Sequence, residues 1–160
     1  MFKQKITMDE FVLMIYSFGY NQYTHMVKYF DENEITIDNN QTFILCETIF
    51  TKLMEKVSDD NNYKITGNLT DKITKMTIDS IQNISEKDIN TLKNYMDIVK
   101  DEAKELINDG NGKISDLVNY FLDEIIVKGT RNNNQVLFLV NLFSNWHMVC
   151  IDITKKYAIK

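Results

Sequence analysis

A short polar turn carries the side chains whose types and spacing could bind an ion. Residues 105–114 read Glu-Leu-Ile-Asn-Asp-Gly-Asn-Gly-Lys-Ile, so carboxylate and amide oxygens stand around two glycines. Oxygen-bearing side chains of this kind are the ligands that a hard cation such as Ca²⁺ prefers. The glycines allow a sharp backbone turn, and a helical pattern resumes directly afterwards. The turn is therefore the first candidate site in the chain.

The spacing of these oxygens disfavours a calcium loop of the EF-hand type. Such a loop needs glycine at its sixth position and side-chain oxygens at the first, third, fifth and twelfth. With Gly112 in sixth place, Asp109 and Asn111 fill the third and fifth positions. Ile107 and Val118 then occupy the first and twelfth, where the essential carboxylates belong. A degenerate calcium-sensor-like light chain is therefore the least favoured alternative, and we expect no metal or other cofactor.

The other reactive side chains form no catalytic pattern. His25 and His147 lie in helical patterns without carboxylate or cysteine partners at ligand spacing, so we interpret both as structural. We find no nucleophile–base pair and no phosphate loop, and we expect a protein that is not an enzyme. Cys46 and Cys150 lie in apolar stretches and are expected as buried thiols rather than a disulfide. The net charge of -5, without a basic patch, argues against a nucleic-acid partner.

The composition favours long helices in a single domain. The 160 residues include no proline and only five glycines, the two residues that helix interiors tolerate least. A chain of this length can bury a core of its own, so we expect one domain over residues 1–160. We find no convincing strand. Apolar residues recur at helical spacing in six segments, near residues 8–30, 42–57, 69–81, 85–106, 114–127 and 136–153.

Several residues should fix the ends and the packing of these helices. Thr7 and Glu10 have the spacing of a capping box before the first helix. Ser85 should cap the fourth helix, and Gly129 should end the fifth. Gly19 lies inside the first helix, where it predicts a kink or a close packing contact.

No membrane or targeting segment is expected. The last apolar segment contains Asn141, Asn145, His147 and Asp152, which makes it too polar for a membrane span. Met1 to Asp9 lacks the apolar run and small-residue cleavage site of a signal peptide.

Three segments, taken in order, resemble the B-cell lymphoma 2 (Bcl-type) family of apoptosis regulators. The turn at 105–114 is similar to the family's first homology motif, which runs roughly Glu-Leu-Phe-x-Asp-Gly-x-Asn-Trp-Gly-Arg-Ile. Residues 50–60, FTKLMEKVSDD, resemble the third motif, with a small residue and an aspartate after an apolar ridge. Residues 9–20, DEFVLMIYSFGY, are similar to the fourth motif, an apolar first helix. The resemblance covers most of the chain and depends on the order and spacing of the motifs.

The chain departs from the family pattern at several points. The tryptophan expected after Asn111 is missing, and Lys113 stands where arginine is usual. Trp146 is the only trace of the second motif. The third-motif segment keeps its apolar ridge of Phe50, Met54 and Val57. In this loss of motif residues the chain resembles the virus-encoded members, which keep the helical fold and lose the motifs.

The resemblance implies an all-α fold that carries a binding groove. The fold would be a compact bundle of about six helices around a central apolar helix, and its groove would bind an amphipathic ligand helix. Lys113 would pair with an aspartate of the ligand, Asn111 would cap or hydrogen-bond it, and Gly112 would let its backbone approach closely. The same alignment gives the groove one wall of Leu106, Ala103 and Val99, a floor of Leu117, Tyr120 and Phe121, and a second wall of Ile65, Leu69 and Ile73.

The implied function is inhibition of apoptosis. The protein would sequester pro-apoptotic host proteins by binding their death-motif helices and so block mitochondrial permeabilisation. It would act in the host cytoplasm or at the mitochondrial outer membrane. The resemblance does not decide between a monomer and a homodimer. The alternative is a viral module with the same fold that inhibits innate-immune signalling through protein–protein contacts. The two hypotheses differ in one feature, because only an open groove accepts a helix.

The residues alone also allow plainer interpretations. Asn-Asp-Gly-Asn-Gly is an ordinary composition for a turn between helices. Lys113 could be a solvated lysine, or it could pair with Asp116 three residues further on. Tyr120 and Phe121 could belong to the core.

Overall fold

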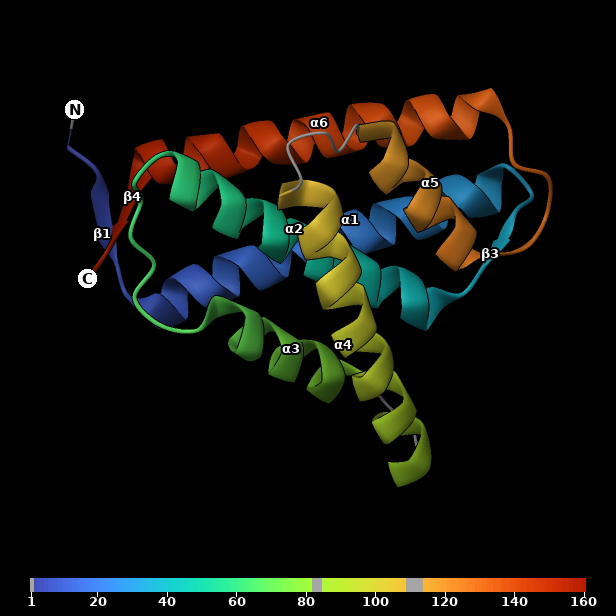
Figure 1. Cartoon of the computed structure of the whole chain (residues 1–160), viewed down its shortest axis with the longest axis horizontal. Helices are drawn as coiled ribbons and strands as arrows, with labels where there is room; N and C mark the ends of the chain where they lie inside the picture. The colour runs from blue at the N-terminus through green and yellow to red at the C-terminus, as the bar shows by residue number, and fades with distance from the viewer. Residues whose placement is uncertain (1, 82–84, 109–113) are drawn as a thin grey trace.

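Six helices and four short strands make up the computed structural model, which describes residues 2–81, 85–108 and 114–160 (Figure 1). The all-helical prediction is confirmed, since each predicted segment contains one helix. The helices are α1 Met8–Glu32, α2 Asn39–Asp60, α3 Leu69–Ser80, α4 Glu86–Asn108, α5 Ile114–Ile125 and α6 Asn133–Lys156. The strands are β1 Gln4–Ile6, β2 Thr36–Ile37, β3 Ile126–Lys128 and β4 Tyr157–Ile159. The expectation of no strand is wrong, because two or three residues are too few to show an alternating pattern.

The predicted helix caps are confirmed at α1 and α4. The Thr7 hydroxyl accepts a hydrogen bond from the Glu10 amide at 3.1 Å, and the Glu10 carboxylate accepts one from the Thr7 amide at 2.7 Å. The Ser85 hydroxyl likewise accepts from the amide of Asp88 at 3.3 Å. These bonds satisfy amide groups that have no partner inside the helix, so the local sequence sets where both helices begin.

The predicted stop at Gly129 is wrong. Helix α5 ends at Ile125, and the next three residues form β3, which pairs antiparallel with β2. Gly129 follows this strand with a φ of 125°, a conformation that favours glycine. A Cβ at this position would also lie 3.1 Å from Cγ1 of Ile35. The glycine therefore serves the turn after β3 and not the end of a helix.

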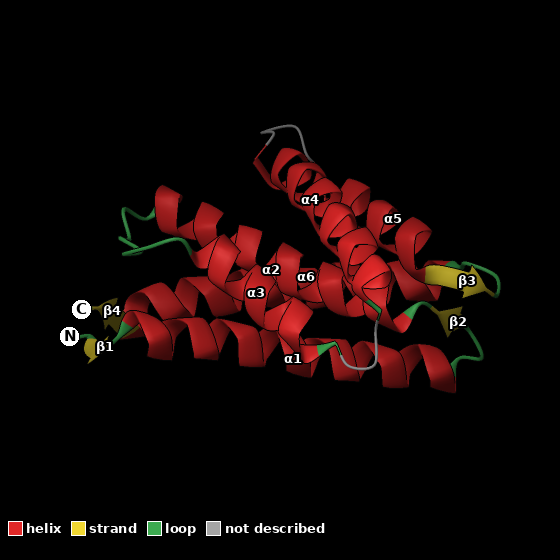
Figure 2. Ribbon diagram, turned by 90° about the horizontal axis from the view of Figure 1, so that it is seen from below, coloured by secondary structure: helices red, strands yellow, loops and turns green. Residues whose placement is uncertain are grey.

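Helix α2 is the central helix of the bundle. It contacts each of the other five helices, and its buried residues extend from Thr42 to Ser58. Phe50, Met54 and Val57, the ridge of the third-motif segment, are all buried. Helix α3 packs along one side of α2 and α6 along the other, while α4 crosses over α2 and also contacts α3 and α5 (Figure 1). Figure 2 shows α1 and α4 on opposite faces of the molecule.

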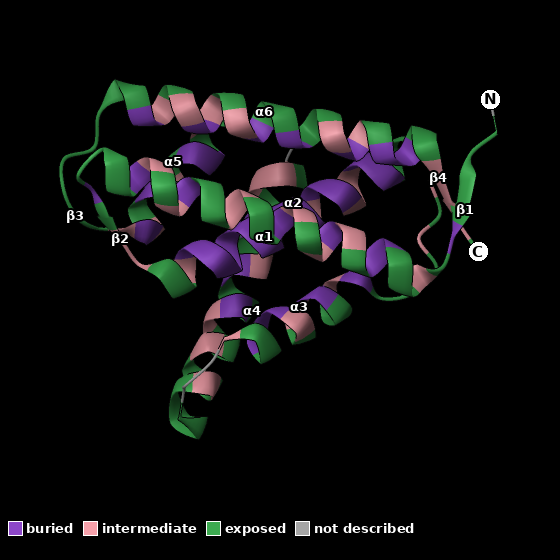
Figure 3. Cartoon of the chain, turned by 180° about the vertical axis from the view of Figure 1, so that it is seen from behind, coloured by how far each residue is buried: buried purple, intermediate pink, exposed green. Residues whose placement is uncertain are grey.

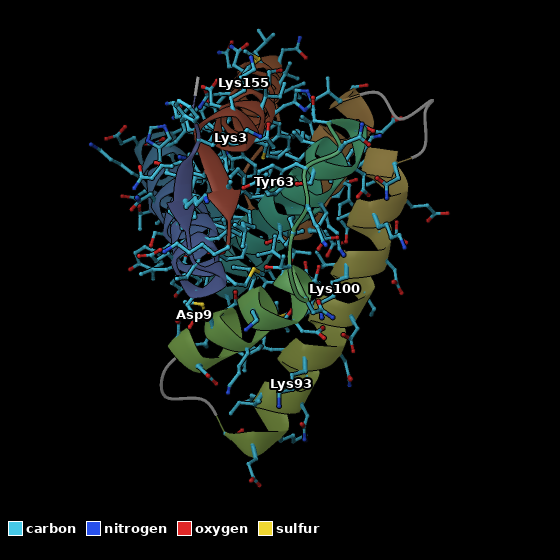
Figure 4. The ribbon with its side chains drawn as sticks, turned by 90° about the vertical axis from the view of Figure 1, so that its left-hand side faces the viewer. Lys3, Asp9, Tyr63, Lys93, Lys100 and Lys155 are labelled. Carbon is cyan, nitrogen blue, oxygen red and sulfur yellow. The ribbon has the colours of Figure 1, made fainter. Side chains whose placement is uncertain are left out.

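The two ends of the chain meet in a parallel pair of strands. Gln4 in β1 is the register partner of Tyr157 in β4, and the Lys160 amide donates to the Ile6 carbonyl at 2.9 Å. The loop between α2 and α3 covers this end of the bundle, where Nζ of Lys3 lies 5.3 Å from the centre of the Tyr63 ring (Figure 4). The first turns of α4 are largely exposed and project from the bundle (Figure 3).

Two further expectations concern the state of the cysteines and the polarity of α6. Cys46 and Cys150 are buried free thiols, as predicted, and burial raises the pKa of Cys150 to about 12. The expectation that polar residues rule out a span in the last segment is not met, because α6 is long and apolar enough to cross a membrane by length and composition. The same helix packs on α2 and α5 and buries Phe143 and Trp146.

Candidate functional site

An open groove lies between α2, the end of α4, the start of α5 and the middle of α6. Its volume is about 430 Å³, and its walls are mostly apolar. We call it the apolar groove; it is lined by Leu53, Lys56, Leu106, Ile107, Ile114, Leu117, Phe143, Ser144, His147 and Met148.

Helical spacing brings these side chains together. Leu53 and Lys56 lie three residues apart on α2, and Ile114 and Leu117 lie three apart on α5, so each pair shares a helix face. Helix α6 contributes two neighbouring rows, Phe143 with His147 and Ser144 with Met148, at spacings of four. The last turn of α4 adds Leu106 and Ile107 to the lining.

Buried residues form the floor of the apolar groove and exposed residues form its rim. Phe143 and Leu117 are 2% and 5% exposed, whereas Ile114 and Met148 are 39% and 56% exposed. Lys56, Ser144 and His147 add polar groups to the lining, and Lys56 pairs with Asp60 at 3.3 Å. An apolar floor with exposed apolar residues at its rim is the usual design of a site that buries hydrophobic side chains of a partner.

Aromatic contacts hold the floor in place. The Phe143 ring packs edge-on against Phe121 at 5.4 Å and lies 4.8 Å from Trp146. Nε1 of Trp146 donates to Oε1 of Gln22 on α1 at 2.8 Å. The buried indole therefore has its hydrogen bond satisfied, and α6 is tied to α1 directly behind the groove.

The structure brings only part of the predicted groove into one site. Leu106 and Leu117 line the apolar groove, as the resemblance implies. Val99, Ala103 and Phe121 are fully buried and offer no surface to a ligand, which corrects their assignment to a wall and a floor. These three residues lie in the core, because the faces of α4 and α5 that carry them pack directly against α2.

The predicted second wall lies elsewhere. Ile65 and Leu69 line a different, polar cavity of about 570 Å³ between α2 and α3. Ile73 borders a space of only about 10 Å³ between α2, α3 and α4. Leu69 and Ile73 are themselves 3% and 2% exposed, so these three residues do not face Leu106 and Leu117 across a groove.

The polar cavity between α2 and α3 holds its own ion-pair network. Nζ of Lys52 donates to the Thr70 hydroxyl at 3.1 Å and to Glu55 at 3.4 Å. The Thr70 hydroxyl also donates to Glu55. Lys52, Thr70 and Glu55 satisfy one another's hydrogen bonds, so neither charged side chain is left to pair with a ligand in the cavity.

Tyr120 on α5 is half-buried and packs against the core. Desolvation by burial, and then the nearby Glu124 and Glu102 carboxylates, raise the pKa of its phenol. The neighbouring Tyr95 donates to Glu124 at 2.8 Å. Tyr120 therefore belongs to an acidic surface beside the groove and is absent from the groove lining.

The glycine turn is outside the described residues. Asn111, Gly112 and Lys113 all fall there, so their roles as ligand cap, close-approach point and ion-pair partner stay predictions. The two positions that argued against calcium are described. Ile107 lines the apolar groove and Val118 is fully buried, so both are engaged in hydrophobic packing. Among the described residues, no group of three or more His, Cys, Asp or Glu side chains could hold a metal ion.

The α6 side of the apolar groove was missed from the sequence. The stripe through Phe143 predicts a buried face, and His147, for which the sequence predicts a structural role, lies exposed at the groove. The exposed Met148 was the available signal, since it interrupts a polar helix face. The chain matches no protein-family model, no curated protein and no solved structure. The site is therefore inferred from this geometry and from the sequence motifs.

Proposed function

We propose that the protein is a helical binding module that takes an amphipathic helix of another protein into the apolar groove. The observation that carries this proposal is the apolar lining itself, with Ile114 and Met148 exposed above Phe143 and Leu117. A volume of about 430 Å³ falls in the range typical of ligand pockets, roughly 300–1,000 Å³. An amphipathic helix presents apolar anchors one turn apart, which suits a groove whose walls are themselves helices.

Apolar anchors would supply most of the affinity. Each large side chain that a partner buries fully contributes about 1.5–3 kcal/mol. The polar lining residues contribute less, because a partly exposed ion pair typically gives about 0.2–1 kcal/mol. Lys56 is already paired with Asp60. An acidic residue of the partner near Lys56 would therefore add little affinity and would mainly fix the orientation of the bound helix.

The partner class follows from the resemblance. We infer that the ligand is the death-motif helix of pro-apoptotic host proteins, and that its sequestration blocks mitochondrial permeabilisation. The order of the three motifs supports this inference, as does the position of the groove, whose lining residues Leu106 and Ile114 stand on either side of the glycine turn. The viral origin, the cytoplasmic or mitochondrial location and the pairing of Lys113 with a ligand aspartate belong to the same proposal.

A second function is favoured by a different observation. The junction of α2, α3 and α4 is closed, with a space of about 10 Å³ where the resemblance places part of a groove. A module with a filled groove would act through an outer face, as an inhibitor of innate-immune signalling does in the alternative hypothesis. The two functions are separated by whether the protein binds an isolated helix.

Calorimetric titration with a panel of pro-apoptotic death-motif peptides tests the proposal. Met148→Glu places a charge in the apolar groove, whereas Leu137→Glu places one outside it on the same helix at nearly equal exposure, 58% against 56%. We expect at least one peptide to bind, Met148→Glu to weaken it about tenfold or more, and Leu137→Glu to leave it unchanged. Peptides with their aspartate replaced by alanine, and Lys113→Glu in the protein, test the ion pair separately.

Two outcomes would contradict the proposal. If the folded protein binds no peptide, helix sequestration is excluded and the signalling module becomes the better hypothesis. If peptides bind and Met148→Glu binds as tightly as Leu137→Glu, then the ligand uses another surface.

A further inference from the structure

A carboxyl group is buried without a partner where α1 crosses α2. Glu47 of α2 is fully buried, and neither of its carboxyl oxygens has a hydrogen-bond partner among the described residues. The opposite residue on α1 is Gly19, where an added Cβ would lie 2.6 Å from Oε2 and 2.8 Å from Oε1. The carboxyl therefore lies against the α1 backbone, which is the close packing contact that the sequence predicts for Gly19.

An aromatic cluster stands beside this contact. Phe43 lies one helical turn before Glu47 on α2, and three α1 tyrosines pack around its ring. The distances between ring centres are 6.3 Å for Tyr16, 5.8 Å for Tyr20 and 5.1 Å for Tyr23.

No described cation compensates the carboxyl. Its titratable neighbours are Tyr16 on α1 and Cys46 on α2, and both carry negative charge when they ionise. The other helices contribute no titratable group that acts on it, and burial is the only cause that raises the pKa of Glu47, to about 9. An ionised carboxylate here would be buried without a counter-charge, which is among the most costly arrangements in a folded protein.

Folding is thereby coupled to uptake of one proton. In the unfolded chain a glutamate carboxyl titrates near its ordinary pKa of 4.5, whereas the folded chain holds the proton up to about pH 9. Between these two values the folded state binds one proton more than the unfolded state. The contribution of Glu47 to stability is therefore fully present below the unfolded pKa and is lost as the pH rises through the window.

We propose that Glu47 is a proton-operated switch in the contact between α1 and α2: the closed bundle keeps this carboxyl as the neutral acid, and loss of the proton separates α1 from α2. Because Gly19 has no side chain, the carboxyl lies directly against the α1 backbone, and an ionised carboxylate would face that helix without a group among the described residues to neutralise it. The carboxyl lies outside the apolar groove, whose lining includes no α1 residue.

Denaturant unfolding at a series of pH values tests the switch. Between about pH 5 and about pH 8 we expect the unfolding constant of the wild type to rise by up to about tenfold per pH unit relative to Glu47→Gln. Glu47→Gln keeps the shape of the neutral acid and removes the titration. Glu32→Gln, an exposed glutamate at the end of α1, is the matched control and should keep the wild-type pH dependence. Equal pH dependence in the wild type and Glu47→Gln would overturn the proposal.

Two further measurements examine the proton and the contact. The infrared carbonyl band of a protonated carboxylic acid should be present in the wild type at neutral pH and missing in Glu47→Gln; its absence from the wild type would refute the neutral acid. Gly19→Ala should destabilise the fold, and Glu47→Ala in the same chain should recover part of the loss; purely additive effects would refute the contact.

Hydrogen exchange locates the movement. After correction for the intrinsic pH dependence, amides of α1 should lose protection before those of α5 as the pH rises, and only in the wild type. A uniform loss across all helices would overturn a switch confined to the contact between α1 and α2.

Discussion

The two flanks of α2 are built in opposite ways. On the α3–α4 flank, where α2, α3 and α4 meet, Ile73 and Met96 are almost fully buried and the space between the helices is about 10 Å³, while the cavity of about 570 Å³ at the start of α3 is polar. On the α5–α6 flank, a groove of about 430 Å³ leaves Ile114 and Met148 exposed. Solvated apolar side chains beside a buried aromatic floor are unfavourable unless a partner covers them. Helix α2 therefore packs tightly where it meets α3 and α4 and leaves apolar surface uncovered where it meets α5 and α6.

The largest effect is expected at the floor of the open flank. Phe143→Ala removes a 2% exposed ring that contacts Phe121 and Trp146, so we expect a loss of about 3–5 kcal/mol of unfolding free energy, measured by urea denaturation. The loss has two causes: the ring leaves a cavity, and its apolar surface no longer contributes to the core. A loss below about 1 kcal/mol would mean that the floor is already loosely packed, and the contrast between the flanks would weaken.

A slightly smaller effect is expected on the closed flank. Ile73→Ala should cost about 2–5 kcal/mol, because α2, α3 and α4 leave little room for repacking. Peptide binding to the folded fraction should stay unchanged in calorimetry. If binding is lost while the fold persists, the ligand uses the α3–α4 flank, and our assignment of the two sides is reversed.

The polar network between α2 and α3 gives a more modest prediction. Lys52→Met should cost about 1 kcal/mol, since this 13% exposed lysine bonds to Thr70 and Glu55. Lys56→Met is the matched control on the same helix, because its pair with Asp60 is more exposed and should contribute about half as much or less. Equal losses in thermal denaturation would show that burial does not distinguish the two pairs.

The smallest effect on stability is expected at the groove rim. Met148→Ala and Leu137→Ala should each change the unfolding free energy by no more than about 0.5 kcal/mol, because both side chains are mainly solvated. Only Met148→Ala should weaken peptide binding. A marked destabilisation by Met148→Ala would show that this residue already completes the core, and the groove would then be closed.

Local signals predicted the elements well. Thr7, Glu10 and Ser85 fix helix starts through bonds to neighbours three residues away, so their spacing is visible in the chain itself. The buried face of α6 follows from the recurrence of Leu139, Phe143, Trp146 and other apolar residues at helical spacing.

The candidate site could not be predicted in the same way. A buried core residue such as Val99 and a groove residue such as Leu106 have the same helical pattern, and only the packing of α4 on α2 separates them. The pairing of Phe143 with Leu117 joins residues from two helices whose relative orientation no local spacing encodes. The strands carry no local signal for a related reason, since β2 and β3 pair between segments that lie far apart in the chain and follow α1 and α5.

The pairing of β1 with β4 has a consequence for how the chain can be rearranged. Because Gln4 and Tyr157 are register partners, the first and last strands run side by side in the same direction. Polypeptide that precedes or follows these strands leaves the bundle from one pole (Figure 1). Since the strands are parallel, the chain enters β1 and leaves β4 at opposite ends of the pair, so reporters fused at the two ends would share this pole and extend in opposite directions. Joining the ends through a linker, with new termini opened in the exposed loop between β3 and α6, would preserve every helix as a continuous segment.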